Sequence, residues 1–325
     1  MKPMRTRSLM MAAAAFVCTV GQLQAQTSVT TPPVGFNKLT LLAGNNLRVN
    51  TFVQAKAFQG AAQSVTSASN SVITVSGTLT ASQFNEVNGV PGYYVEILDA
   101  GSNQGMITDV VSNTAGSITV ASNLAAFSVS GTASFCVRPH TTLSTLFGSG
   151  SGLSPGTDSV KLFYPNNSNK SFLFTGSGSS WIDAGTGADA GGEVIYPGQG
   201  FIITVASPVN VIITGSVKDG PTIVPLYAGA VNVVGTINPA VGGSQTLSNF
   251  NWISTFTAGL DSVNVYNDTG ALQQLGSFIS TGSSLINAGT GASGDTQAVP
   301  PSNSVVVSVS QSKNWVMPSF YTPVP

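Results

Sequence analysis

The chain has 325 residues, of which 42% are hydrophobic and only 7% are charged, and its formal net charge is −1. A chain of this length and composition can bury a sizeable core and is expected to divide into two or three domains. It lacks the basic patch that nucleic acid binding needs, so we expect no nucleic acid partner.

The first residues have the layout of a secretory signal peptide. Three basic residues within the first seven positions precede an apolar stretch from Leu9 to Val20, and a cleavage-like Leu23-Gln24-Ala25 follows. We expect residues 1–25 to be removed, which leaves eight basic against twelve acidic residues and a formal charge of −4. The apolar stretch is too short for a spanning helix, and no later run of about 18 apolar residues supplies one. The sequence therefore predicts an exported protein without a transmembrane helix, with an extracellular or cell-surface location favoured and the periplasm left open.

Short strands dominate the mature chain. Runs rich in Val, Ile, Thr, Phe and Tyr are each ended within a few residues by Gly, Pro, Asn or Ser. Helical periodicity is limited to Thr142–Phe147 and to Thr246–Phe250, where a threonine is available as the N-terminal cap. The predicted fold class is therefore all-β.

Residues 58–134 contain an internal repeat. Gln59-Gly60 and Ile73-Thr-Val75 recur 45 residues later as Gln104-Gly105 and Ile118-Thr-Val120. We expect two similar strand pairs, with polar turns at Ser69-Asn70 and at Ala115-Gly116, that close with further strands into a barrel of five or six strands. A closed module of this kind can be inserted into a surface loop of a host domain.

Cysteine usage predicts no disulfide. Cys18 is removed with the signal peptide, and Cys136 is then the only cysteine of the mature chain. Cys136 lies in a strand-like run, where a small buried side chain is the simpler interpretation, and a nucleophilic pair with His140 is the alternative.

The C-terminal half repeats the part of the chain before it. Trp181-Ile-Asp-Ala-Gly-Thr-Gly-Ala188 recurs as Leu285-Ile-Asn-Ala-Gly-Thr-Gly-Ala292 at an offset of 104, and Asp158 matches Asp261 at an offset of 103. A weaker match relates Ala43–Phe52 to Ala228–Ile237 at an offset of 185, so the first copy must be interrupted.

These offsets predict two homologous β-sandwich or open-barrel domains that arose by internal duplication, the first interrupted by the barrel-like module. How the two copies pack is left open. The predicted boundaries are a signal peptide at 1–25, a first copy at 26–57 plus 135–217, an inserted module at 58–134 and a second copy at 218–325.

One acidic, glycine-rich loop is a candidate metal site. Asp183, Asp189 and Glu193 lie within eleven residues that hold four glycines, and calcium prefers several oxygen ligands on a tightly folded backbone. The spacing fits no complete calcium motif, and the second copy has Asn287 in place of Asp183. A loop kept for its turn geometry is the simpler interpretation, and calcium is the only cofactor the sequence suggests.

Other candidate chemistry is sparse. Four carboxylates could supply a pair for sugar hydrolysis, but no spacing selects one, so we expect no enzyme. The four are Glu86, Glu96, Asp99 and Asp109. Trp181, Trp252 and Trp315 could form a sugar-stacking platform, but burial in a core is the simpler interpretation. The turn Tyr196-Pro-Gly-Gln-Gly-Phe201 is explained by its role in leading Phe201 into a strand.

Several segments carry a resemblance to a known group of proteins. They are Gly35–Leu41, Phe135–Phe147, Asp158-Ser-Val160 and the Pro-Gly-x-Gly-Phe turn that ends at Phe201. Together they resemble an uncharacterised verrucomicrobial-type family of exported, β-rich paralogous proteins. The resemblance covers nearly the whole mature chain and implies export and architecture, but that family has no assigned activity and supplies no site residue.

Three classes of function stay open. The leading one is a non-enzymatic structural or adhesive protein of the cell envelope or extracellular matrix, which predicts self-association. The alternative is a polysaccharide-binding protein, which predicts exposed aromatic side chains along one face of a sheet. An outer-membrane β-barrel is less favoured, since the predicted strands are short and the C-terminus lacks a terminal aromatic residue.

Overall fold

The computed structural model describes residues 33–321 except 100, 149–150, 177–179 and 240–244. Its regular structure is almost entirely β-strand, which confirms the all-β prediction. No helix in this part of the chain has the length and apolar character needed to cross a membrane. The signal peptide predicted at residues 1–25 lies outside the described residues and stays a prediction.

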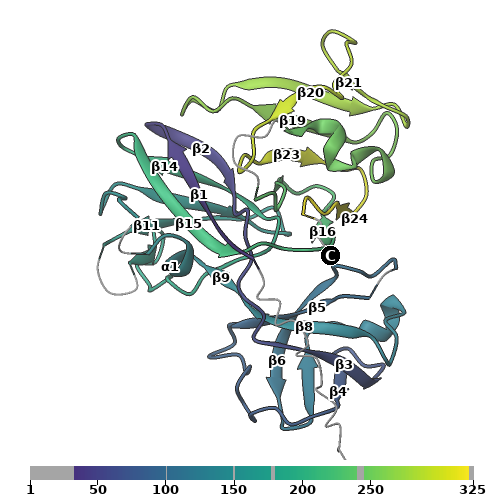
Figure 1. Cartoon of the computed structure of the whole chain (residues 1–325). Helices are drawn as coiled ribbons and strands as arrows, with labels where there is room; N and C mark the ends of the chain where they lie inside the picture. The colour runs from purple at the N-terminus through teal and green to yellow at the C-terminus, as the bar shows by residue number, and fades with distance from the viewer. Residues whose placement is uncertain (1–32, 100, 149–150, 177–179, 240–244, 322–325) are drawn as a thin grey trace, which may run out of the picture. The chain divides into compact units, whose positions relative to one another are not determined.

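Six strands close into a small barrel, as the sequence predicted (Figure 1). Around the barrel they follow the order β3-β4-β7-β6-β5-β8. Apolar side chains such as Ile73, Val110 and Phe135 fill its interior. A short 3-10 helix, η1, spans Leu124–Phe127. The strands are β3 (Phe58–Val65), β4 (Val72–Val75), β5 (Tyr93–Ile97), β6 (Ile107–Asn113), β7 (Ser117–Val120) and β8 (Ser134–Pro139).

The structure refines two details of this module. Strand β8 pairs with both β3 and β5, so the barrel extends to Pro139, beyond the predicted boundary at residue 134, because it cannot close without this strand. The 45-residue offset holds for β4 and β7 but becomes 48 for β3 and β6, where Ala62 pairs with Val75 and Val110 pairs with Val120. The turn after β6 is three residues shorter than the turn after β3, which accounts for the difference.

The first copy is a sandwich of a five-stranded sheet, in the order β12-β11-β10-β14-β2, and the ribbon β1-β15. Leu41 from β1, Val160 from β10 and Val211 from β15 meet in one core, so the two sheets share a buried interior. The strands β9 and β13 form a separate small pair. The elements are β1 (Val34–Leu41), β2 (Gly44–Val49), β9 (Thr141–Thr142), α1 (Leu143–Leu146), β10 (Ser159–Phe163), β11 (Asn169–Phe174), β12 (Trp181–Asp183), β13 (Val194–Ile195), β14 (Gly200–Val205) and β15 (Val209–Ser216).

The second copy has the same topology, strand for strand. Its sheets follow the orders β21-β20-β19-β23-β17, β16-β24 and β18-β22. That this common topology arose by duplication stays an inference from the sequence repeat. The elements are β16 (Thr222–Leu226), β17 (Asn232–Val234), β18 (Gln245–Thr246), η2 (Leu247–Phe250), η3 (Trp252–Ser254), β19 (Ser262–Tyr266), β20 (Gln274–Ser280), β21 (Leu285–Asn287), β22 (Ala298–Val299), β23 (Val305–Ser308) and β24 (Lys313–Met317).

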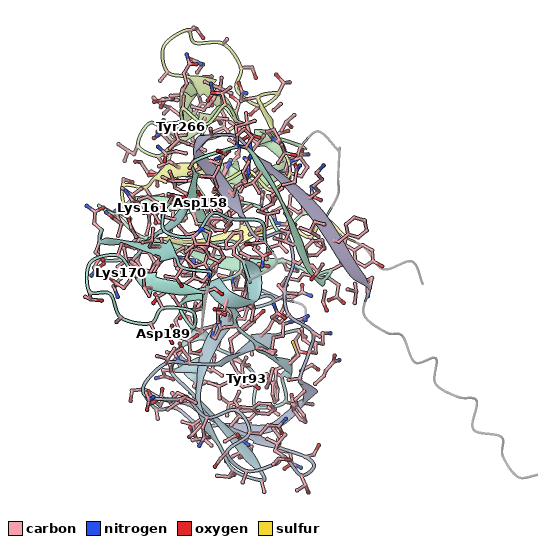
Figure 2. The ribbon with its side chains drawn as sticks, turned by 90° about the vertical axis from the view of Figure 1, so that its left-hand side faces the viewer. Tyr93, Asp158, Lys161, Lys170, Asp189 and Tyr266 are labelled. Atoms are coloured by element: carbon pink, nitrogen blue, oxygen red, sulfur yellow. The ribbon has the colours of Figure 1, made fainter. Side chains whose placement is uncertain are left out.

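Buried polar side chains fix corresponding turns in both copies. Asp158, labelled in Figure 2, and Asp261 are each fully buried and each accept hydrogen bonds from two backbone amides. The amide donors are those of Ser154 and Ala206 for Asp158, and those of Thr257 and Ser310 for Asp261. A buried carboxylate needs such donors, so both aspartates have a structural role at corresponding turns of the two copies.

A second such pair corrects the alignment of the weaker repeat. Asn46 donates to the carbonyls of Leu42 and Ile203, and Asn232 donates to those of Tyr227 and Val307. Asn46 therefore corresponds to Asn232 at an offset of 186, whereas the sequence match gave 185. The turn before Asn232 is one residue longer than the turn before Asn46. The sequence alignment did not place this extra residue in the turn, so its offset is one too small.

The two copies meet through reciprocal contacts. The Val49 amide donates to the Ser302 carbonyl at 2.9 Å, and the Gly235 amide donates to the Gly198 carbonyl at 3.0 Å. Val49 corresponds to Gly235 at an offset of 186, and Gly198 corresponds to Ser302 at an offset of 104. Each of the two hydrogen bonds is therefore equivalent to the other with the copies exchanged. The copies are therefore related by a pseudo-twofold axis, a geometry that the sequence left open.

The Pro-Gly-x-Gly turn lies at this axis. Gly200 at the start of β14 faces its counterpart Ser304, and a Cβ on Gly200 would come within 2.6 Å of the Ser304 Cβ. Gly198 has a positive φ of 80°. The turn is therefore glycine-rich because it is the contact surface between the copies, a role beyond the one predicted for it.

Candidate functional site

The polar side chains of the barrel gather on the outside of β5 and β8. Successive strand residues face opposite sides, so Val95 and Val137 enter the barrel core while Glu96 and Arg138 face outward. Both outward side chains are nevertheless buried. They are covered by other parts of the chain, since Lys218 contacts Glu96 and the Gln54 carbonyl accepts a hydrogen bond from Arg138.

Three of these groups, Glu96, Arg138 and Lys218, form a buried cluster of charges, the ion trio. Glu96 contacts Lys218 through Oε1 at 2.5 Å and Arg138 through Oε2 at 2.8 Å, and each side chain is no more than 2% exposed. Lys218 also donates to the Pro221 carbonyl at 2.6 Å, and Arg138 donates to the Gln54 carbonyl at 2.8 Å. The ion trio thus joins the barrel to the segment that enters the second copy.

The protonation state of Glu96 follows from these contacts. Burial favours the neutral acid, but the positive charges of Lys218 and Arg138 outweigh burial and hold the pKa of Glu96 below its ordinary value. The carboxylate is therefore ionised at neutral pH and carries one negative charge between two positive ones.

Cys136 and His140 do not form the nucleophilic pair that the sequence raised as an alternative. The Cys136 thiol donates to Glu96 at 3.5 Å, whereas His140 Nε2 lies 3.0 Å from Asp109 Oδ1. Burial and the nearby Glu96 charge raise the pKa of Cys136 to about 12. Since the thiolate is the reactive form of cysteine, the protonated Cys136 side chain is not nucleophilic at neutral pH.

A second polar cluster surrounds His140. Asp109 on β6 accepts a 2.9 Å hydrogen bond from the Tyr196 hydroxyl, and the rings of Tyr94 and Tyr196 lie 5.0 and 5.1 Å from the imidazole. Burial, followed by the Asp109 charge, raises the pKa of Tyr196. The His140 side chain is fully buried, so the imidazole is not accessible to a substrate, whereas the Asp109 side chain is 27% exposed. The cluster connects the barrel to the first copy.

The calcium candidates are occupied by turn contacts. Asp183 Oδ1 accepts hydrogen bonds from two amides in its own loop, and Asn287 Oδ1 accepts the equivalent pair in the second copy. Asp189 Oδ1 accepts from the Gly191 amide, and Glu193 Oε1 accepts from a tyrosine hydroxyl. The Asn287 side-chain amide thus makes the same turn contacts as the Asp183 carboxylate, so turn geometry explains the loop. Within the described residues no three His, Cys, Asp or Glu side chains are grouped to hold a metal ion.

The three tryptophans are core residues, as the simpler interpretation predicted. Trp181, Trp252 and Trp315 are at most 1% exposed. The exposed large aromatic residues of the described chain are Phe36 on β1, Phe127 on η1 and Tyr196 in the turn after β13. These three residues do not form the aligned row on one sheet face that the polysaccharide alternative predicted.

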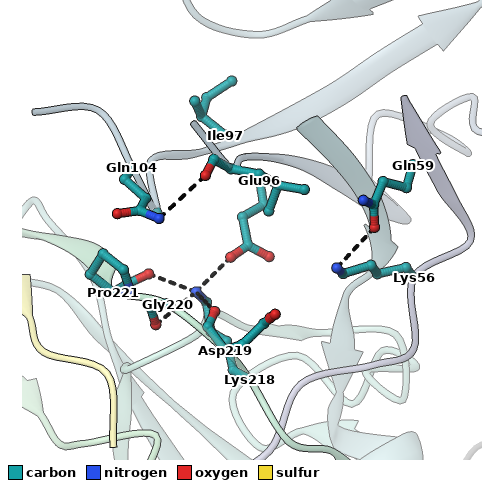
Figure 3. Close-up of a pocket in the computed structure, with 11 residues that line it drawn as sticks. Lys56, Gln59, Glu96, Ile97, Gln104, Lys218, Asp219, Gly220 and Pro221 are labelled. Carbon is teal, nitrogen blue, oxygen red and sulfur yellow. Dashed lines mark hydrogen bonds and ion pairs between the residues drawn. The ribbon is translucent and has the colours of Figure 1, made fainter. Parts of the chain in front are cut away.

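A cavity of about 180 Å³ lies beside the ion trio, between the barrel and the segment Lys218–Pro221 (Figure 3). Glu96 and Gln104 line its barrel side, Lys56 and Gln59 close another side, and Asp219 lies opposite. These five side chains are polar, and Ile97, Leu98 and Pro221 add apolar surface to the lining. The polar groups make the cavity a place for a hydrated or charged ligand.

Sequence reasoning missed the ion trio. Glu96 was one of four scattered carboxylates, and Lys218 marked only the start of the second copy. The available signal was the alternation in β5 and β8, which placed Glu96 and Arg138 on the same side of the barrel wall. Nothing in the local pattern indicated that this side is covered.

The chain matches no family model, and no curated protein or solved structure is significantly similar to it. The resemblance to the verrucomicrobial-type family accordingly has no support from these comparisons and stays a prediction.

Proposed function

We propose that this chain is an exported, non-enzymatic structural or adhesive β-domain protein of the cell envelope or extracellular matrix. The observation that carries the proposal is the outer face of the ribbon β1–β15. Val34, Phe36 and Ile212 on this face are 77%, 72% and 64% exposed. Large apolar side chains gathered on one exposed face are typical of a contact surface.

The chemistry of this face favours a second copy of the chain as its partner. Lys38 is the only charged residue in either strand, so a charged polymer finds little charge complementarity there. Two eight-residue strands present roughly 250 Å² at about 3.4 Å per residue and 4.8 Å between strands. A stable dimer needs roughly 800 Å² per partner, so we expect weak association that depends on concentration.

The use of the reactive groups supports a structural function. The ion trio and the cluster around His140 both connect the barrel to the host copies, and the side chains of Glu96, Lys218 and His140 are buried in these contacts. Groups that an enzyme would expose to its substrate are here part of the joints between β modules.

Location is the first test. Intact cells that express the native chain are treated with an external protease and then probed for the mature protein. Digestion, or recovery from the medium, is the expected result. Full protection would contradict an adhesive function at the cell surface, because a protein confined to the periplasm cannot contact an outside surface.

Self-association is the second test. Sedimentation velocity across a range of concentrations should show association of the wild-type chain that Phe36→Ser weakens. Leu260→Ser is the matched control, since Leu260 is 65% exposed and lies on a turn of the second copy. Equal behaviour of wild type and Phe36→Ser would remove the β1–β15 face from the proposal.

A further inference from the structure

We infer that the cavity beside the ion trio binds a small carboxylate anion. The cavity lies between the barrel and the segment Lys218–Pro221, and its 180 Å³ equal the volume of roughly six water molecules. This space suits a ligand between acetate and a single uronic acid in size. The inference does not depend on where the protein is located or on whether it self-associates.

The ion trio has one more positive charge than negative charges. Lys218 and Arg138 each bring one positive charge, and Glu96 is their only ion-pair partner in the described structure. The trio therefore carries a net charge of +1 in a site that is almost closed to water. Carbonyl oxygens of Gln54 and Pro221 accept hydrogen bonds from the two cations but do not neutralise them.

An uncompensated buried charge is costly, and its field extends into the nearest polar space. That space is the cavity, because Glu96 and Lys218 both line it (Figure 3). The charges of Lys56 and Asp219, which also line the cavity, cancel each other, so a single negative charge bound there would bring the site to neutrality. A dianion would exceed the charge to be balanced and would be repelled by Glu96 and by Asp219, so a monovalent carboxylate is the better match.

Lys56 supplies the direct contact. Its Nζ has three N–H donors, of which one reaches Gln59 Oε1 at 2.9 Å. Two donors are thus left for a ligand, and the Gln59 amide lines the same wall. Lys56 lies on the opposite side of Glu96 from Lys218 in Figure 3, so a bound carboxylate would lie in the field of both lysines.

Asp219 is the one lining carboxylate besides Glu96, and it opposes an anion. Its side chain is exposed to solvent, which screens its charge more than that of the buried trio. We therefore expect Asp219 to weaken binding without abolishing it.

The test uses the full-length chain and isothermal titration calorimetry at constant ionic strength. Sodium acetate and sodium glucuronate are the probes, with glucose and inorganic phosphate as comparisons. Saturable binding of acetate and glucuronate, no binding of glucose and weaker binding of phosphate are expected. Lys56→Gln should weaken glucuronate binding at least tenfold, and Asp219→Asn should strengthen it several-fold.

Lys38→Gln is the matched control, because it removes the same charge from the exposed face of β1. Circular dichroism verifies that each variant is folded. The inference would be overturned by the absence of saturable carboxylate binding, by equal losses in Lys56→Gln and Lys38→Gln, or by phosphate binding as tightly as glucuronate.

Discussion

The ion trio makes the Glu96→Gln variant the sharpest test of the joint between the barrel and its hosts. The amide keeps the shape of the side chain but leaves Lys218 and Arg138 buried side by side without a counter-ion. Removing one partner of a buried ion pair typically costs about 3–5 kcal/mol. Since the free energy of unfolding of a domain is about 5–15 kcal/mol, the loss should be plain in a urea titration.

The position of the tryptophans allows the assay to separate the modules. None lies in the barrel, so tryptophan fluorescence reports the two copies, while far-UV circular dichroism reports the whole chain. In Glu96→Gln we expect the barrel to unfold at lower urea than the copies, so that the two signals no longer coincide. Glu86→Gln, which changes an exposed carboxylate of the barrel, is the control.

The pH dependence has a definite sign. The folded pKa of Glu96 lies below its value in the unfolded chain, about 4.3, so its stabilisation is complete above that pH. It is lost as the pH falls through the lower, folded pKa. The difference between wild type and Glu96→Gln should therefore be constant from pH 6 to 8 and shrink in acid. A loss below about 1 kcal/mol at pH 7, with coincident transitions, would refute the reasoning.

Three further outcomes follow from single contacts. Gly105→Ala should destabilise the joint by about 1–3 kcal/mol, because φ is +81° and the new Cβ would lie 2.2 Å from a carbonyl oxygen. Gly116 has open space around it, so Gly116→Ala is the control and should change the free energy of unfolding by less than about 0.5 kcal/mol in the same urea titration. In a Cys18→Ser background, Cys136 should resist maleimide at pH 8 until the barrel unfolds, and prompt labelling of the native chain would contradict its burial and its pKa of about 12. Burial alone would raise the pKa of Asp261, but hydrogen bonds from a lysine and from backbone amides hold it at about 2. Asp261→Asn should therefore lower the free energy of unfolding by about 1.5–3 kcal/mol at pH 7. Calorimetry should find this difference constant above pH 4 and lost as the pH falls towards 2.

Local patterns were enough to predict the strands and their turns. The polar turns at Ser69-Asn70 and Ala115-Gly116 join paired strands as expected, because hairpin turns depend on a few adjacent residues. The matching anchors Asp158 and Asp261 likewise make the same backbone contacts in both copies. The sequence alignment near Asn232 is wrong by one residue, because the turn there is longer and only its hydrogen bonds show which residues correspond.

The chain by itself thus determined an all-β fold, a barrel between two parts of a repeated unit, and buried tryptophans, since periodicity and turn residues act over short distances. Only the tertiary structure decided what covers the polar face of the barrel. Glu96 and Lys218 are 122 positions apart in the sequence, and alternation in a strand shows which side a residue faces but not what packs against it. The ion trio, its cavity and the pseudo-twofold contact all depend on such distant pairings, which no local pattern of residues encodes.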